Sequence, residues 1–174
     1  MMLTAFSIAS CGSDEPRYAD PEAHENIVQL NEQYGPLIVG TWLYENISDT
    51  LCFFERLTFQ ADGTLTGMRK WQTRKPVTID GEQRYTDWED VELSGTFTGT
   101  WQLRYWSPEG NSGEKRNCLF LNAQYEGANS GHMAYSNIAT FDYADETTLR
   151  FEGFYFKDKD GWITFLRGNQ EPSF

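Results

Sequence analysis

The feature that most constrains this chain is an alternation of apolar and polar residues with a period of two, which starts near Leu37. It is visible in the pair Leu57 and Phe59 and again in the pair Leu149 and Phe151. Successive side chains of a β-strand point to opposite faces of a sheet, so this period predicts strands that bury one face. No helical period interrupts the pattern, which argues against a fold of alternating helices and strands.

Turn residues divide this region into short strands. Gly, Asp, Asn, Ser and Pro gather between the apolar runs, as in Ala61-Asp62-Gly63, and these residue types favour tight turns. Consecutive short strands are typical of a sandwich or a closed barrel, and closure removes the exposed sheet edges. We therefore expect an all-β fold, an eight-stranded antiparallel up-and-down barrel with a short N-terminal helix. The predicted strands cover residues 39–47, 51–60, 64–72, 93–106, 117–125, 133–142, 148–156 and 162–167.

Length and charge limit the classes of function. A chain of 174 residues is long enough for one domain with a substantial core. Its formal net charge of −12 argues against nucleic acid as a partner, because phosphate binding needs a basic surface. It argues equally against electrostatic adsorption to an anionic membrane. We expect a monomer that binds no nucleic acid.

The first residues predict a targeting segment. Residues 1–10 are interpreted as the remnant of a signal peptide, and Ile8-Ala9-Ser10-Cys11 resembles the lipobox of bacterial lipoproteins. The resemblance implies cleavage before Cys11 and lipidation of that residue, so that acyl chains anchor the protein to a membrane.

Residues 11–19 form an acidic tether, which is either a plain solvated linker or an export signal. Acidic residues directly after the lipidated cysteine resemble the surface-export signal of Bacteroidetes lipoproteins. This resemblance implies an outer-membrane location on the outer face of the cell.

A short helix is predicted over residues 20–36. Asp20 fits the N-cap, Pro21 the first helical position, and Gly35-Pro36 the end of the helix. Its apolar stripe suggests either a lid on the barrel of residues 37–174 or a loosely held spacer. Residues 73–92 then interrupt the strands, and we expect a long hairpin-like excursion over one barrel end.

Several motifs together resemble the lipocalin-like domains of Bacteroidetes lipoproteins, within the calycin group. They are Gly40-Thr41-Trp42, its repeat Gly99-Thr100-Trp101, the stretch from Leu57 to Thr64, and Phe165-Leu166-Arg167. The resemblance covers residues 37–168. It implies that Gly40 and Trp42 open the first strand and that Arg167 packs over Trp42 and closes the barrel.

Catalytic patterns are not evident in the sequence, so we expect neither an enzyme nor a bound cofactor or metal. His24 and His132 do not lie in a metal-ligand spacing. Cys52 and Cys118 fall on strands that are not neighbours in an up-and-down barrel, which predicts two separate buried thiols.

Two functions remain open. In the first, the barrel mouth binds a small apolar or amphipathic ligand. In the second, aromatic side chains fill the barrel, and its exterior contacts a protein of the cell envelope or a glycan. For Trp71 and Trp106 we favour a role in the core or the barrel wall. The candidate contact residues are Trp71, Tyr85, Trp88, Tyr105 and Trp106.

Overall fold

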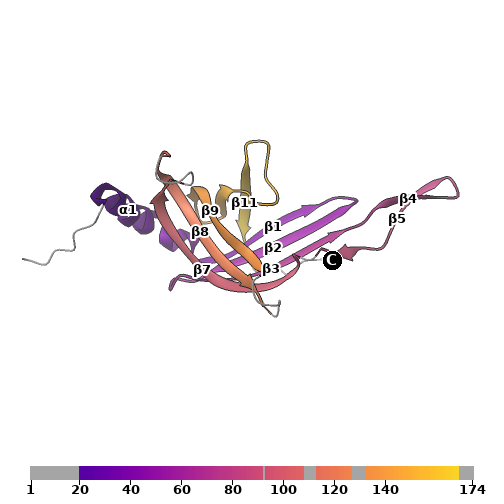
Figure 1. Cartoon of the computed structure of the whole chain (residues 1–174), viewed down its shortest axis with the longest axis horizontal. Coiled ribbons are helices and arrows are strands. Elements are labelled where there is room, and N and C mark those ends of the chain that lie inside the picture. Colours follow the sequence, from indigo (N-terminus) through magenta and orange to yellow (C-terminus); the bar gives the residue numbers. More distant parts are fainter. Residues whose placement is uncertain (1–19, 92, 108–112, 127–131, 169–174) are drawn as a thin grey trace, which may run out of the picture.

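The computed structural model describes residues 20–91, 93–107, 113–126 and 132–168. These residues form a closed antiparallel β-barrel of eight strands, preceded by one helix (Figure 1). The expected all-β up-and-down barrel is therefore confirmed. The barrel strands are β1 (Gly40–Ile47), β2 (Leu51–Phe59), β3 (Thr64–Thr73), β7 (Gly95–Trp106), β8 (Arg116–Tyr125), β9 (Met133–Ala144), β10 (Thr148–Glu152) and β11 (Trp162–Arg167).

Each barrel strand pairs with the next along the chain, and the sheet closes where β1 meets β11. Alternate side chains point inward and make one core, as the period of two predicts. Burial of each large apolar side chain contributes about 1.5–3 kcal/mol. The core includes Trp42, Leu57, Phe59, Leu65, Phe97, Leu119, Leu121, Leu149, Phe151 and Phe165.

The helix α1 (Pro21–Ile38) begins as predicted but ends later. The Asp20 carboxylate caps it by accepting from the Ala23 amide at 2.9 Å. The chain stays helical through Gly35-Pro36, so the predicted end at residue 36 is wrong. Proline near the last turn removes one backbone donor, and the end of the helix gains other donors from the barrel, described below.

One barrel end is covered by α1. Leu30 and Ile38 are buried against the barrel core, and the ring of Tyr34 meets that of Phe141 edge-on at 5.0 Å. Of the two alternatives for this helix, a lid on the barrel or a loosely held spacer, the structure shows the lid. Within the described part of the chain, no helix has the length and apolar character needed to cross a bilayer.

The opposite barrel end is filled by residues 153–156, which were expected to continue a strand to residue 156. Strand β10 instead stops at Glu152. The chain turns sharply at Gly153, where a Cβ would lie 2.3 Å from the carbonyl oxygen of Phe156. This turn carries Phe156 inward until its ring lies 4.3 Å from that of Phe53. Residues 154–156 are therefore not part of the strand predicted over 148–156; they pack across the barrel end, and we call them the aromatic plug.

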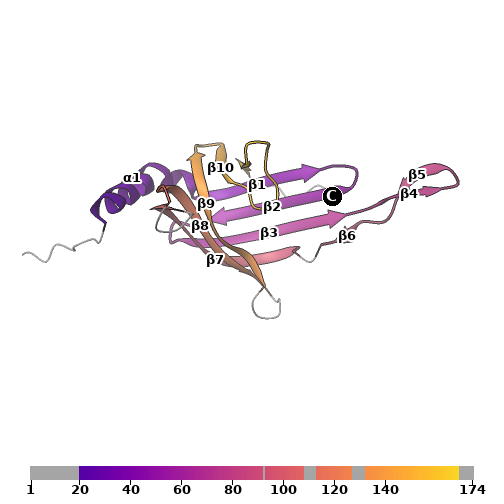
Figure 2. The ribbon, with the colours of Figure 1, turned by 45° about the horizontal axis from the view of Figure 1, so that its top comes forward.

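The excursion between β3 and β7 contains a hairpin, as expected, but does not cover the barrel end. Its strands β4 (Pro76–Ile79) and β5 (Glu82–Tyr85) project away from the barrel in both ribbon views (Figures 1 and 2). The short β6 (Glu89–Asp90) returns along the end of β3. We call residues 76–85 the arm. Elsewhere, the strand predicted to start at residue 93 starts at Gly95, and β9 extends to Ala144.

Candidate functional site

The barrel interior is filled. Under the aromatic plug, in the described part of the chain, lies a partly enclosed space with a volume of about 10 Å³. This is close to the minimum space for one water molecule and far below the roughly 300 Å³ of a small-molecule pocket. The space is lined by Phe53, Glu55, Tyr135, Phe151, Phe154, Tyr155, Phe156, Ile163 and Phe165.

Beside this space lies a buried ion pair that the sequence analysis missed. Glu55 on β2 and Arg69 on β3 face each other in register, with 2% and 1% of their surfaces exposed. The Nε and Nη2 atoms of Arg69 donate to the same Glu55 oxygen at 2.8 and 2.5 Å. Its Nη1 donates to the Tyr125 hydroxyl at 2.6 Å, and that hydroxyl donates to the carbonyl of Leu93. The pair is thus satisfied by the protein itself.

Aromatic rings surround the guanidinium. The nearest are those of Tyr155 and Tyr135, whose centroids lie 4.5 and 5.1 Å from the Arg69 Cζ atom. Burial is the largest single influence on the pKa of Arg69 and lowers it, but the Glu55 carboxylate, Tyr135 and Tyr125 together raise it by more, so the pKa is raised overall. Burial also raises the pKa of Tyr125 to about 12, and that of Tyr135 well above its ordinary value. Arg69 stays charged, and its donors are engaged inside the barrel.

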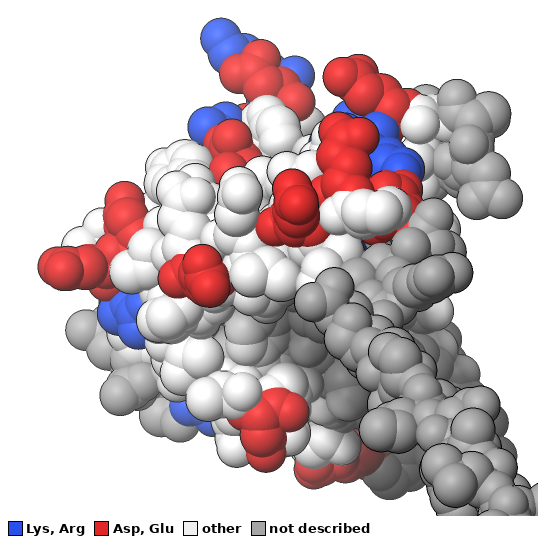
Figure 3. All heavy atoms as spheres, turned by 90° about the vertical axis from the view of Figure 1, so that its left-hand side faces the viewer, with Lys and Arg blue, Asp and Glu red and all other residues white. Residues whose placement is uncertain are grey.

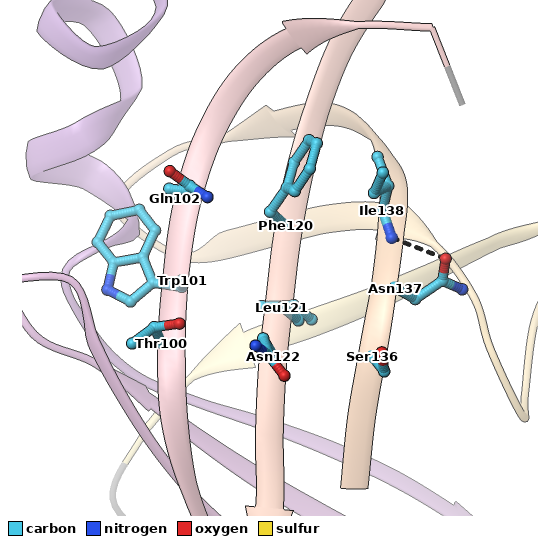
Figure 4. A pocket seen from close by; sticks show the side chains of 9 residues that line it. All are labelled: Thr100, Trp101, Gln102, Phe120, Leu121, Asn122, Ser136, Asn137 and Ile138. Carbon is cyan, nitrogen blue, oxygen red and sulfur yellow. Dashed lines mark hydrogen bonds between the residues drawn. The ribbon is translucent and has the colours of Figure 1, made fainter. Parts of the chain in front are cut away.

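An open hollow with a volume of about 420 Å³ lies on the outer surface of β7, β8 and β9 (Figure 4). Outward side chains line it in two rows that follow the strand register. The upper row in the figure is Gln102, Phe120 and Ile138, and the lower row is Thr100, Asn122 and Ser136. We call these six side chains, together with Asn137, the outer hollow.

The chemistry of the outer hollow is polar and uncharged. Phe120 provides an aromatic ring, and the Arg104 guanidinium lies 5.4 Å from its centroid. The Gln102 carbonyl oxygen accepts from Arg104 at 3.0 Å, which leaves the Gln102 amide nitrogen as a donor. Among the residues that line the hollow, none carries a charge. A second hollow of about 370 Å³, over β1, β2, β3 and β7, differs because Arg56 and Glu126 line it.

One edge of the outer hollow adjoins a gap in the barrel wall. The register of β9 with β10 ends at Phe141 and Phe151, so the preceding part of β9 pairs only with β8 in the described chain. The Ile138 amide therefore finds a side-chain acceptor, the Asn137 Oδ1 atom at 2.7 Å, shown dashed in Figure 4. This bond fixes the Asn137 side chain, whose amide nitrogen is left as a second donor.

The surroundings of the outer hollow contrast with the helical end of the molecule. Figure 3 views that end and shows many more carboxylates than basic groups on its described surface. Helix α1 contributes Glu22, Glu25 and Glu32. The lining of the outer hollow, by contrast, contains no charged side chain.

The structure brings together Gly40, Trp42 and Arg167. The Arg167 guanidinium lies 4.3 Å from the centroid of the buried Trp42 ring, which is the arrangement the resemblance implied. A Cβ at Gly40 would lie 2.4 Å from the Arg167 Nη1 atom. This group is structural, and none of its three residues lines either hollow. Cys11, the expected lipidation site, lies outside the described residues.

The five candidate aromatic residues do not form one site. Trp71 packs under the plug, with its ring 5.5 Å from that of Tyr155. Tyr85 and Trp88 lie at the base of the arm, and both rings are 4.4 Å from the Arg74 guanidinium.

Tyr105 and Trp106 lie at the far end of β7. Trp106 is 41% exposed on the barrel strand β7, so of the two roles expected for it the core position is wrong. The sequence does not show how the strands pair, and the pairing in the structure places these aromatic residues far from one another. Cys52 and Cys118 are buried and unbonded, as expected.

In comparisons with protein families, characterised proteins and solved structures, nothing matches this chain. The fold and the site therefore define its class: an all-β protein with a closed, filled barrel and an open polar hollow on its wall. Sequence reasoning missed the outer hollow, although Thr100, Gln102 and Asn122 are polar residues at outward positions of predicted strands. Alternation marks such positions as exposed but does not show which of them face each other.

Proposed function

We propose that this protein is a binding module that contacts a neutral glycan through the outer hollow, with its barrel filled. One contrast carries the proposal: the space under the aromatic plug has a volume of about 10 Å³, against about 420 Å³ in the outer hollow. Of the two functions expected from the sequence, this contrast favours the filled barrel over a small ligand in the barrel mouth.

The chemistry of the lining favours a glycan over a lipid. A sugar presents hydroxyl groups, which both donate and accept, and an apolar ring face. Amides and hydroxyls such as those of Asn122, Thr100 and Ser136 can match the hydroxyl groups. The ring of Phe120 offers an apolar surface for the sugar ring. A lipid chain would need a wider apolar lining than Phe120 and Ile138 provide.

The proposed setting is the cell envelope. We propose that a lipid on Cys11 anchors the chain to the outer membrane, facing the outside of the cell, and that the barrel belongs to the lipocalin-like type. The sequence Ile8-Ala9-Ser10-Cys11 supports the anchor, and the Trp42–Arg167 contact supports the barrel type. Replacement of Cys11 by Ser is expected to move the protein from the membrane fraction to the soluble fraction.

A glycan array probed with the full-length protein tests the glycan proposal. Binding to one or more neutral oligosaccharides is expected, and Asn122→Ala should weaken it about tenfold, the effect of one lost hydrogen bond. Gln124→Ala is the matched control, because Gln124 is an exposed residue on the same face of β8 outside the hollow. Binding to charged glycans alone, or equal losses in both variants, would contradict the proposal.

A further inference from the structure

The arm is a two-stranded sheet that stands apart from the barrel (Figures 1 and 2). Its strands are joined by Asp80-Gly81, and both of these residues have positive φ, 53° and 82°. Positive φ at both positions makes a type I′ turn, whose twist suits a tight hairpin. Isolated two-stranded hairpins are marginally stable in water, and their outer edges are open to pairing.

The two edges of the arm are not equivalent. Backbone bonds alternate along an antiparallel pair, and the residues next to a two-residue turn, Ile79 and Glu82, bond to each other. The backbone groups of Thr78 and Gln83 therefore point outward, one on each edge. The β4 edge begins with Pro76, which has no amide to donate and blunts that edge. The β5 edge contains no proline.

We propose that the β5 edge pairs with the β5 edge of a second copy of this chain, antiparallel, about a twofold axis at Gln83. This register sets Glu82 opposite the partner's Arg84, and Arg84 opposite the partner's Glu82. Within one chain the two side chains already lie on the same face, with an ion pair of 3.3 Å between Arg84 Nη2 and Glu82 Oε2. Opposite charges in directly facing positions favour cross-strand pairing, so this short strand is complementary to itself.

The position of the arm also favours a second copy. Each chain carries a formal charge of −12, so two barrels repel each other at short range. Antiparallel pairing of the arms puts the two barrels at opposite ends of a four-stranded sheet. Repulsion between charges is largely screened beyond about 10 Å at ordinary salt, so this geometry avoids it. The resulting state is a dimer, where the sequence led us to expect a monomer.

Disulfide trapping tests the proposal in the full-length chain with Cys11→Ser. Gln83→Cys is expected to form a covalent dimer on mild oxidation, because facing residues of a bonded pair have Cα atoms about 5.5 Å apart. Thr78→Cys is the matched control: it pairs with Gln83 within the arm and is as exposed. In the proposed dimer the two copies of Thr78 are three strand spacings apart, about 14 Å, beyond disulfide reach.

Charge exchange gives a second, independent readout. Glu82→Arg places like charges opposite each other and should raise the dimer dissociation constant about tenfold in sedimentation experiments. The double variant Glu82→Arg/Arg84→Glu restores complementary charges and should restore dimerisation. The proposal is overturned if Thr78→Cys crosslinks as well as Gln83→Cys, if Gln83→Cys stays monomeric, or if the double variant is as weak as the single one.

Discussion

Arg167 and Trp42 face each other on the two strands that close the barrel, and both also cap the helix that precedes it. The Trp42 indole donates to the Ile38 carbonyl at 2.7 Å. The Arg167 guanidinium donates to the carbonyl of Leu37, and to that of Val39 at 3.1 Å. The last carbonyls of a helix lack partners within it, so the barrel supplies them. Barrel closure and the end of the helix are one structural unit.

Trp42→Ala is expected to lower the free energy of unfolding by about 3–5 kcal/mol. The side chain is fully buried, and its loss leaves a cavity and an unpaired Ile38 carbonyl. Denaturant unfolding measures the change. The control Trp106→Ala removes a partly exposed indole and should lower stability by clearly less than Trp42→Ala. A near-neutral Trp42→Ala would remove the main support for the lipocalin-like barrel.

Alanine at two glycines should act in opposite directions. Gly40→Ala meets a φ of 138° and the Arg167 guanidinium, so it should destabilise the protein by more than about 1 kcal/mol. Gly35 lies inside α1, and a Cβ at this position would meet nothing within 4 Å, so Gly35→Ala should stabilise by about 0.5–1 kcal/mol. Thermal unfolding of both variants measures the change in stability that each substitution causes. A change of the same sign in both variants would contradict this prediction.

Replacing one partner of the Glu55–Arg69 ion pair should lower the free energy of unfolding strongly, whereas replacing both partners should lower it much less. Arg69→Met leaves the Glu55 carboxylate buried without its partner, and a loss of about 3–5 kcal/mol is expected. The double variant Glu55→Leu/Arg69→Met removes both charges and should recover much of that loss. A double-mutant cycle in urea measures the coupling. If the double variant loses the sum of the two single losses, the pair is not coupled as described.

Alkaline pH should weaken the fold through Tyr125. Burial raises its pKa from 10.0 to about 12, so the folded state holds this proton more tightly than the unfolded state. The resulting stability is fully present below pH 10 and is lost as the pH rises through about 12. Denaturant unfolding across this window should show a shallower decline in Tyr125→Phe. The arm variant Tyr85→Phe is the control and should behave like the unchanged protein.

The sequence predicted the strands because alternation is a local property. It could not predict the end of α1, because the donors that cap the helix come from Trp42 and Arg167, in strands elsewhere in the chain. Residues 154–156 are all aromatic and directly follow a strand, but the tight turn at Gly153 directs them over the barrel end.

The buried ion pair could have been predicted in part from the sequence. Glu55 follows Phe53 and precedes Leu57 at the spacing of an inward face, so a charge at that position required a buried partner. The outer hollow and the arm edge left no such signal. Both depend on which outward residues face each other across strands, and register is a property of the fold.

The closing contact between β1 and β11 also sets an order of folding. Among the described residues, two pairs register there, Trp42 with Arg167 and Leu43 with Leu166. The Arg167 bond to Val39 spans 128 residues along the chain. Contacts between such distant residues form slowly, because the intervening chain loses conformational entropy before the stabilising contact is made. A chain that emerges N-terminus first therefore keeps the β11-facing edge of β1, and the carbonyls of Leu37 and Val39, without these partners until Arg167 arrives.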